Sequence, residues 1–284
     1  MTVNCQLMLI GEDQKVLIDA ASAIELQTLA LEKKYNFYAK NSWLNYHINN
    51  RGLSQVVLDT QSAAVFSCVR ELSVATQGLF DITTGTLKRA AQSNKLQSLD
   101  LLFEKYQHAI GLDSWSINGP ILTFKSPETQ FDLGGVIKEY AVDQAMTLCR
   151  KLDINSGLIN FGGDVISWGC KPDGSPFRVA IQNPLEPSKV CGSICLKNQA
   201  MATSGHYERQ FKYGSQAYSH ILTNKQINQK VISVSVISNS VLTSGIFSTA
   251  LCIKPSLSNK VKSIIAPLFI DDQLKFHRDP SSLT

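Results

Sequence analysis

The stretch "FDLGGVIKEYAVD" (residues 131–143) joins a strand-like run to a helix-like run through a pair of glycines. Asp132 precedes the pair Gly134–Gly135, and Lys138 falls within the first turn of the expected helix. Glycine lets a ligand approach the backbone closely, and the first N–H groups of a helix are free to bind an anion. Lys138 is placed to reach the same anion, for example a phosphate group. Taken alone, the motif is explained more simply as a tight turn at a strand-to-helix corner.

Elements of both kinds surround this corner. Apolar residues at helical spacing predict helices over residues 21–38, 59–78, 136–154 and 243–253. Alternation predicts an opening hairpin over 4–19, a second hairpin over 114–133 with its turn at 118–120, and further strands over 156–169, 177–184, 192–205 and 230–240. The mixture predicts an α+β fold of mixed, mostly antiparallel sheets with flanking helices. No repeat or linker interrupts the pattern, so we expect a single domain over 1–284.

The composition narrows the class of protein. The chain has 284 residues, of which 44% are hydrophobic and 18% charged, enough for a sizeable core. A net charge of +4, with no basic run interleaved with aromatics, argues against a nucleic-acid partner. Seven scattered cysteines favour reduced thiols. The sequence shows neither a secretory signal nor an apolar run near the roughly 20 residues of a membrane span. We therefore expect a cytoplasmic, soluble protein.

Three further segments also combine glycine with carboxylate or hydroxyl side chains. "INFGGDVISWG" (159–169) sets Asp164 beside a second glycine pair, "MATSGHYER" (201–209) supplies Thr203 and Ser204, and "GLFDITTGTL" (78–87) carries Asp81. Each is compatible with a simple turn, but together they indicate a site for a phosphate-bearing ligand. None fits the dinucleotide pattern GxGxxG or the P-loop pattern GxxxxGK[ST], so another binding scheme is expected. The histidines show no metal-ligand spacing.

In this order, the segments resemble the FAD:protein FMN transferases, the ApbE-type flavin transferases. The resemblance rests on "GLFDITTGTL", "FDLGGVIKEYAVDQA", "GLINFGGDV", "FRVAIQNP", "MATSGHYER", "SHIL" and "FSTALCI", and on the earlier segment "NFYAKNSWLNYHIN" (36–49). It implies an ApbE-like fold, FAD as the substrate and a divalent metal, usually Mg²⁺. Members transfer the FMN part of FAD through its phosphate to a threonine or serine hydroxyl of a target flavoprotein, and release AMP.

The resemblance also implies a set of site residues. Those expected to line the FAD site are Tyr38, Leu79, Phe80, Asp81, Asp132, Lys138, Thr203, Ser204, His220 and Ile221. Thr249 and His220 are expected to act in catalysis, and the carbonyl of Gly135 with Thr249 to bind the metal. These residue types suit phosphoryl transfer, which depends on positioning and on neutralising charge at the phosphate oxygens.

Two departures from the family pattern bear on the chemistry. The family places an aspartate and a threonine four residues apart on a late helix, on one face, where both bind the metal. Here the threonine is Thr249, but the aspartate position is Gly245. Losing a hard oxygen ligand predicts Mg²⁺ binding that is weakened or absent. In the second departure, "HILTNKQINQKV" (220–231) lacks the family's Asp-Pro and Thr-Gly. Because this loop borders the reacting phosphate in the family, the resemblance implies a loss in catalysis more than in binding.

Three hypotheses follow from the departures. The chain is an active flavin transferase with a depleted metal site, or a catalytically impaired FAD-binding relative that carries flavin or binds a partner. The third hypothesis is a metal-dependent FAD hydrolase that uses water as the acceptor. We favour the first slightly over the second, and both over the third.

Overall fold

The computed structural model describes residues 3–93, 99–205, 210–213, 216–219 and 230–283. Contacts divide the chain into two units. Unit 1 consists of Met1–Glu32, Ile137–Glu208 and Ile227–Thr284, and unit 2 consists of Lys33–Val136 and Arg209–Gln226. Helices and antiparallel sheets occur in both units, so the predicted α+β class is confirmed. The single domain over 1–284 stays a prediction.

Unit 1 is built on an antiparallel sheet of seven strands in the order β1-β5-β6-β9-β12-β13-β14. The strands are β1 (Cys5–Ile10), β5 (Ser156–Phe161), β6 (Asp164–Trp168), β9 (Ala200–Gly205), β12 (Val231–Ser238), β13 (Ala266–Asp271) and β14 (Phe276–His277). The turn between β5 and β6 is made by Gly162 and Gly163, whose φ angles are 60° and 96°. This second glycine pair is therefore a hairpin turn, a conformation that glycine adopts without steric cost.

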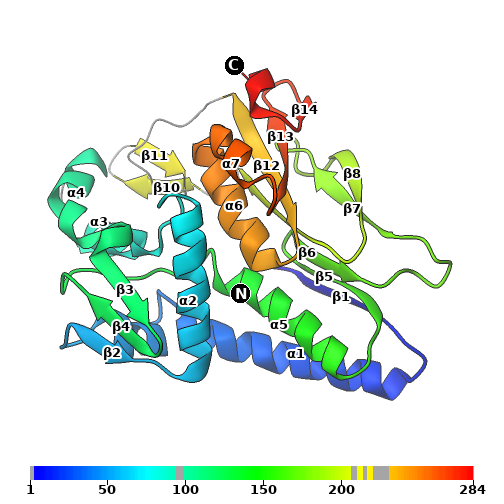
Figure 1. Cartoon of the computed structure of the whole chain (residues 1–284), viewed down its shortest axis with the longest axis horizontal. Helices are drawn as coiled ribbons and strands as arrows, with labels where there is room; N and C mark the ends of the chain where they lie inside the picture. The colour runs from blue at the N-terminus through cyan, green and yellow to red at the C-terminus, as the bar shows by residue number, and fades with distance from the viewer. Residues whose placement is uncertain (1–2, 94–98, 206–209, 214–215, 220–229, 284) are drawn as a thin grey trace. The chain divides into compact units, whose positions relative to one another are not determined.

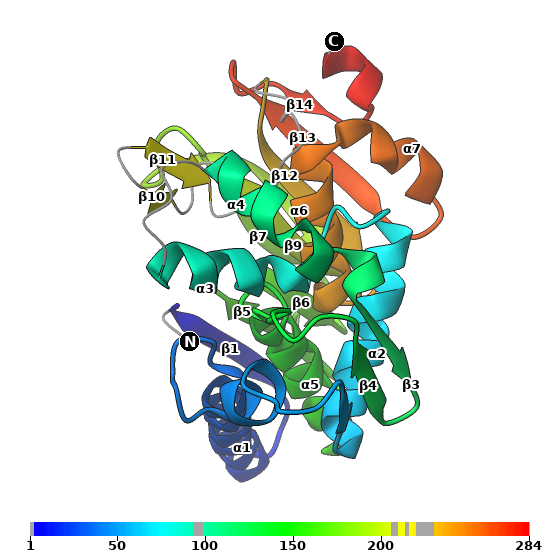
Figure 2. The ribbon, with the colours of Figure 1, turned by 90° about the vertical axis from the view of Figure 1, so that its left-hand side faces the viewer.

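Helices α5 (Ile137–Lys151) and α6 (Val241–Ile253) lie side by side against this sheet (Figures 1 and 2). α5 packs on β5 and β6, and α6 packs on β9 and β12. α6 is buried on nearly every side and includes the small residues Gly245 and Ala250, which allow close packing. The remaining helical segments of unit 1 are most of α1 (Gln14–Tyr35), together with η5 (Pro255–Leu257), α7 (Ser258–Val261) and η6 (Pro280–Leu283).

A two-stranded hairpin, β7 (Phe177–Gln182) with β8 (Val190–Leu196), packs on the same sheet. Its Leu196 forms a core cluster with Val165 and Met201, which are opposite each other on β6 and β9. Successive side chains of a strand point to opposite faces, so the neighbouring pair Ile166 and Ala200 points the other way. The predicted strands in this part of the chain are confirmed.

Unit 2 combines short helices with a three-stranded antiparallel sheet in the order β2-β4-β3. Its described elements are η1 (Leu44–Asn49), β2 (Gln55–Val57), α2 (Thr60–Ala75), η2 (Ile82–Thr84), α3 (Gly85–Ser93), α4 (Leu99–Tyr106), η3 (Gln107–Ala109), η4 (Leu112–Ser114), β3 (Trp115–Asn118), β4 (Ile121–Phe124), β10 (Gln210–Tyr213) and β11 (Gln216–Ser219). Phe131 is the centre of an aromatic core, with its ring centroid 5.4, 5.0 and 5.1 Å from those of Phe66, Trp115 and Phe124. The segment that precedes the first glycine pair is thus anchored in the core.

The predicted opening hairpin over residues 4–19 is wrong in its second half. β1 pairs with β5, and α1 begins at Gln14. The reason is local, because one carboxylate oxygen of Asp13 accepts the backbone N–H groups of Lys15 and Val16 at 2.8 and 3.2 Å. Such a side-chain acceptor satisfies the free donors at the start of a helix and favours the helix over a second strand.

Other expected elements are confirmed. α2 begins after its N-cap Asp59, whose side chain accepts the N–H of Ser62, and the hairpin β3–β4 turns at Gly119 with a φ of 55°.

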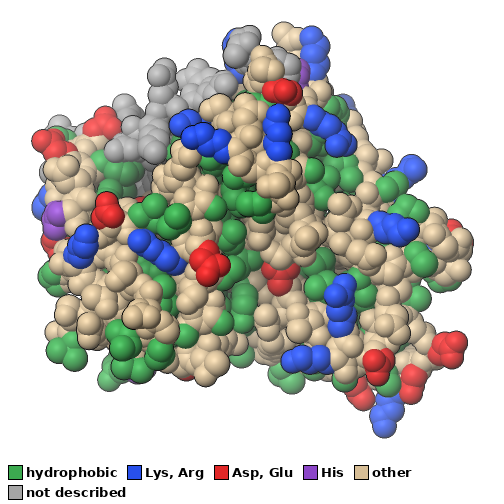
Figure 3. All heavy atoms as spheres, viewed as in Figure 1, with side chains coloured by type: hydrophobic (Ala, Val, Ile, Leu, Met, Phe, Trp, Pro, Cys, Tyr) green, Lys and Arg blue, Asp and Glu red, His purple; other side chains and the backbone are tan. Residues whose placement is uncertain are grey.

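Among the described helices, none combines the length and the apolar character needed to cross a bilayer. On the face drawn in Figure 3, basic and acidic side chains are interspersed.

Candidate functional site

The predicted site residues fall into two groups, one in each unit. Asp132, in unit 2, is held by three interactions. Its backbone N–H donates to the carbonyl of Ile82 at 2.9 Å, and its carboxylate accepts the N–H of Gly134 at 2.8 Å. The other carboxylate oxygen lies 2.5 Å from Nζ of Lys88, and the Asp132 side chain is only 5% exposed. Asp132 is therefore a buried, paired carboxylate that fixes the loop before the glycine pair.

Gly85 explains how the start of α3 approaches this loop so closely. A Cβ atom on Gly85 would lie 2.7 Å from the backbone N of Asp132 and 2.7 Å from the backbone carbon of Phe131. Real Cβ atoms do not approach backbone atoms so closely, so only glycine fits without displacement. The segment "GLFDITTGTL" thus packs directly against "FDLGG" within unit 2.

Asp81 has a structural explanation for its burial. Its carboxylate caps η2 by accepting the N–H of Thr83 at 2.8 Å, and it also accepts the N–H of Gly111 at 3.0 Å. Burial raises the pKa of Asp81, while these hydrogen bonds to Thr83 and Gly111 act against the rise. The carboxylate joins two loops of unit 2.

The other predicted residues of unit 2 differ in exposure. Leu79 and Phe80 are buried, whereas Tyr38 is 69% exposed. The Phe80 ring lies beside Gly135, since a Cβ on that glycine would be 3.6 Å from the ring. Exposed Tyr38 is the member of this group whose aromatic face is available to a ligand.

In unit 1, Lys138 lies in a cluster of charges. Its ammonium pairs with a carboxylate oxygen of Asp164 and lies 3.7 Å from Oε1 of Glu139. Burial and the charge of Glu139 raise the pKa of Asp164 well above its ordinary value, against the opposing effect of Lys138. Two buried carboxylates and one ammonium thus stand at the start of α5.

A second feature of unit 1 is a run of hydroxyl groups between β9 and α6. Ser204 Oγ shares hydrogen bonds with Ser248 Oγ at 2.8 Å and with Thr249 Oγ1 at 3.2 Å. Thr203 Oγ1 shares one of 2.8 Å with Ser235 Oγ on β12. The structure therefore brings two predicted residues, Ser204 and Thr249, into direct contact. His220 and Ile221 lie outside the described residues.

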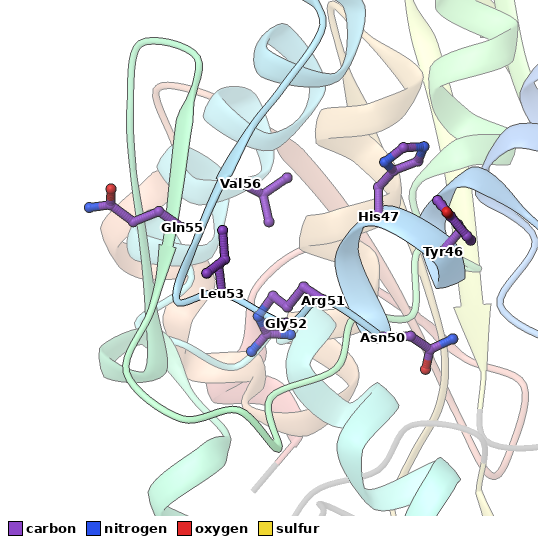
Figure 4. A pocket seen from close by; sticks show the side chains of 8 residues that line it. All are labelled: Tyr46, His47, Asn50, Arg51, Gly52, Leu53, Gln55 and Val56. Carbon is purple, nitrogen blue, oxygen red and sulfur yellow. The ribbon is translucent and has the colours of Figure 1, made fainter.

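A separate pocket of 470 Å³ lies in unit 2 (Figure 4). The residues that line it are Tyr46, His47, Asn50, Arg51, Gly52, Leu53, Gln55 and Val56. Arg51 is the cation of this pocket, but its guanidinium donates to the carbonyls of Ile48, Thr129 and Ser126 at 2.7 to 2.9 Å. Burial lowers the pKa of Arg51 to about 10. Arg51 therefore holds the fold together, and none of the predicted site residues lines this pocket.

A model of the ApbE family matches residues 1–265. The chain belongs to the ApbE family.

Individual relatives agree with this assignment. The FAD:protein FMN transferase of Vibrio cholerae is 27% identical over 206 residues, which are 69% of this chain and 62% of that protein. The protein of the same name from Rhodobacter capsulatus is 32% identical over 194 residues, 65% of this chain and 36% of the relative. That of Escherichia coli K12 is 24% identical over 258 residues, 86% and 73% of the two chains. The chain thus matches less than two thirds of the length of the first two relatives.

Solved structures show the same fold. The ApbE protein of Thermotoga maritima superposes with a TM-score of 0.84 at 24% identity, and covers 99% of this chain and 97% of its own. The flavin transferase ApbE of Vibrio cholerae gives 0.80 at 23% identity, with 99% and 95% covered. The prediction of an ApbE-like fold is therefore confirmed.

The metal expected of an ApbE protein needs hard oxygen ligands. Among the described residues, no group of three or more His, Cys, Asp or Glu side chains is arranged to hold an ion. One carboxylate oxygen nevertheless suits a metal ion: Oε2 of Glu139 is buried and has no hydrogen-bond partner in the part of the chain that the structure describes. Thr249 offers a hydroxyl on α6. The residues present are thus compatible with a cation bound partly by water or substrate.

Sequence reasoning missed three residues of these groups. Lys88 pairs with Asp132, Glu139 joins the cluster of Lys138, and the carboxylate of Asp143 accepts backbone N–H groups at the start of α6. All three lie in or beside the quoted motifs, and Asp143 ends the first one. Their charge next to a glycine-rich segment was the available signal.

Proposed function

We propose that this protein is an FAD:protein FMN transferase. The observation that carries the proposal is the match of the ApbE family model over residues 1–265, together with curated relatives of that name. The described site residues support it, since they include buried carboxylates, a lysine at a helix start and paired hydroxyls.

The proposed reaction joins the flavin phosphate to a protein. An acceptor threonine or serine oxygen attacks the FMN phosphorus of FAD, a new P–O bond forms, the pyrophosphate P–O bond breaks and AMP leaves with the bridging oxygen. The hydroxyl proton is released. Positioning and charge neutralisation dominate such a transfer, and a bound divalent cation supplies part of that neutralisation.

The chain's own residues would divide these tasks. Tyr38, Leu79, Phe80, Asp81 and Asp132 would position the FAD, and Thr203 and Ser204 would offer hydroxyl groups to it. Lys138, although paired with Asp164, would add positive charge near a phosphate. His220 and Ile221 would complete the FAD site, and His220 and Thr249 would act in catalysis. The carbonyl of Gly135 and the hydroxyl of Thr249 would bind the metal.

One observation favours a second candidate, an FAD-binding relative with impaired catalysis. Position 245 carries glycine where the family pattern expects a carboxylate, and segment 220–231 lacks the family's Asp-Pro and Thr-Gly. An activity assay distinguishes the two candidates.

The test incubates the purified protein with FAD, Mg²⁺ and an acceptor domain that carries the family's target threonine. We expect a flavin-fluorescent acceptor band in a denaturing gel and one AMP released for each flavin transferred. Tight FAD binding without a band would favour the impaired relative. Free FMN and AMP without a band would favour the hydrolase, and no FAD binding would overturn the proposal.

A further inference from the structure

Glu139 presents a buried carboxylate oxygen that nothing in the described chain satisfies. The residue lies in the first turn of α5 and is 6% exposed. Its Oε2 accepts no hydrogen bond from any described residue, and Oε1 lies 3.7 Å from Lys138 Nζ. Burying an unpaired carboxylate oxygen is costly, so native structures pair nearly all such atoms with a donor, a water or an ion.

The side chain of Glu139 occupies the space beside Gly245 of α6. A Cβ atom on Gly245 would lie 2.8 Å from Cγ of Glu139, 3.4 Å from Cδ and 3.5 Å from Oε1. A side chain at position 245 would therefore extend into the volume that Glu139 fills. Position 245 on α6 lacks the carboxylate of the family pattern, and Glu139 on α5 places its own carboxylate in the space beside that position.

Thr249 lies on the same face of α6, one turn after Gly245. Residues four apart on a helix are neighbours on its surface, so the Glu139 carboxylate is delivered to the face that carries the Thr249 hydroxyl. Oxygen atoms of a carboxylate and a hydroxyl suit Mg²⁺, which usually keeps several waters and takes only one or two carboxylates.

The charges around Glu139 leave room for a cation. Glu139 and Asp164 carry two carboxylates, and Lys138 supplies the ammonium that pairs with Asp164. A divalent ion next to Glu139 would relieve the electrostatic repulsion between the carboxylates of Glu139 and Asp164. A proton shared by Glu139 and Asp164 is the competing explanation.

We propose that Glu139 is the carboxylate ligand of a divalent cation and replaces the acid that the family pattern places at position 245. The cation would contact Glu139 Oε2 and Thr249 Oγ1, with water or a substrate phosphate at its remaining positions. This inference rests on the proposed function, because it assigns a ligand to the metal which that reaction uses.

The test measures binding of Mn²⁺, used in place of Mg²⁺, by the electron paramagnetic resonance signal of the free ion, with and without saturating FAD. Three variants are compared with the unaltered protein: the single variant Glu139→Gln, the double variant that combines Glu139→Gly with Gly245→Asp, and the control Glu25→Gln, at an exposed position of α1. We expect one Mn²⁺ per chain, at least about tenfold weaker binding in Glu139→Gln, and recovery to within a few-fold in the double variant. The control should bind as the unaltered protein does.

Two outcomes would overturn the inference. Unchanged Mn²⁺ affinity in Glu139→Gln would show that the carboxylate is not a ligand, and absence of binding with and without FAD would favour the shared proton. Thermal melting of each variant checks that it is folded. Mn²⁺ binding that depends on Glu139 without flavin transfer would refute the proposed function alone, whereas transfer with Glu139-independent binding would refute the inference alone.

Discussion

The carboxylate of Asp143 accepts the backbone N–H of Val241 at 2.7 Å and that of Leu242 at 3.0 Å. This contact joins the middle of α5 to the N-terminus of α6, far along the chain. A helix start has free donors and partial positive charge, so a carboxylate there supplies both hydrogen bonds and favourable electrostatics. Asp143 thereby helps to hold α5 beside α6, and with it the spacing between Glu139 and Gly245.

Asp143 predicts a dependence of stability on pH. Burial raises its pKa from 3.8 to about 6, so the native state holds the proton more tightly than the unfolded chain does. Its contribution to the free energy of unfolding is therefore fully present below about pH 4 and is lost as the pH rises through about 6. The loss corresponds to about 3 kcal/mol at most.

We expect the variant Asp143→Asn to lack this dependence. Urea denaturation at several pH values between 4 and 7 should show the unfolding free energy of the unaltered protein falling relative to that of the variant as the pH rises. The exposed Asp100→Asn variant corrects for general effects of pH. A difference between the two proteins that stays constant over this range would refute the assignment.

The Lys88–Asp132 pair predicts a large effect of removing one partner. Changing Lys88 to Met leaves a buried carboxylate, 5% exposed, without its counter-charge. Breaking a buried pair in this way costs about 3 to 5 kcal/mol, and we expect about 3 because the Lys88 side chain is 23% exposed.

Denaturant unfolding of Lys88→Met, Asp132→Asn and the double variant completes a cycle for this pair. Adding Asp132→Asn to Lys88→Met should recover part of the lost stability, because the unpaired charge is then gone. If the two single losses simply add, the pair is not coupled, and the loop that carries Asp132 is held by other contacts.

Gly85 predicts a steric effect at the same loop. In Gly85→Ala, the new methyl group would lie 2.7 Å from backbone atoms of Phe131 and Asp132, and backbone cannot move aside cheaply. We expect a loss of about 1 to 3 kcal/mol in unfolding free energy. Gly52→Ala is the matched control, since nothing lies within 4 Å of its added Cβ atom. Equal melting temperatures of the two variants would contradict the close approach.

Most of the helices and strands could be predicted from local patterns in the sequence. The helices and strands between residues 114 and 169 follow from periodicity and from turn residues such as Gly119, whose φ is 55°. In the predicted opening hairpin over 4–19, the first strand is correct, but a helix forms in place of the second strand. The alternating pattern contains no information on the carboxylate of Asp13, which accepts the first N–H groups of that helix. A single hydrogen-bonding side chain outweighed the pattern there.

The site was less predictable because its contacts join distant segments. Asp132 was singled out, but its partner Lys88 is 44 residues earlier, and sequence gives residue types without pairings. Glu139 looks like an ordinary helix residue next to Lys138. Its burial depends on the absence of a side chain at Gly245, which the sequence shows only as a missing carboxylate.

Gly245→Asp is the substitution that the sequence alone suggests for restoring a metal ligand, and the structure predicts that it fails. Its Cβ would lie 2.8 Å from Cγ of Glu139, so Glu139 must move, and a third carboxylate joins those of Glu139 and Asp164. We expect the single variant to lose about 1 to 3 kcal/mol of stability and to gain no flavin transfer. Adding Glu139→Gly removes both the overlap and the extra charge.

Melting curves and the acceptor fluorescence assay on the single and double variants test this expectation. The double variant should melt above Gly245→Asp and transfer more flavin than it does, because one carboxylate again faces Thr249. Suppose instead that Gly245→Asp alone melts like the unaltered protein and transfers flavin faster. Glu139 would then leave the space beside Gly245 freely, and the native chain would be an enzyme weakened by the loss of its α6 carboxylate.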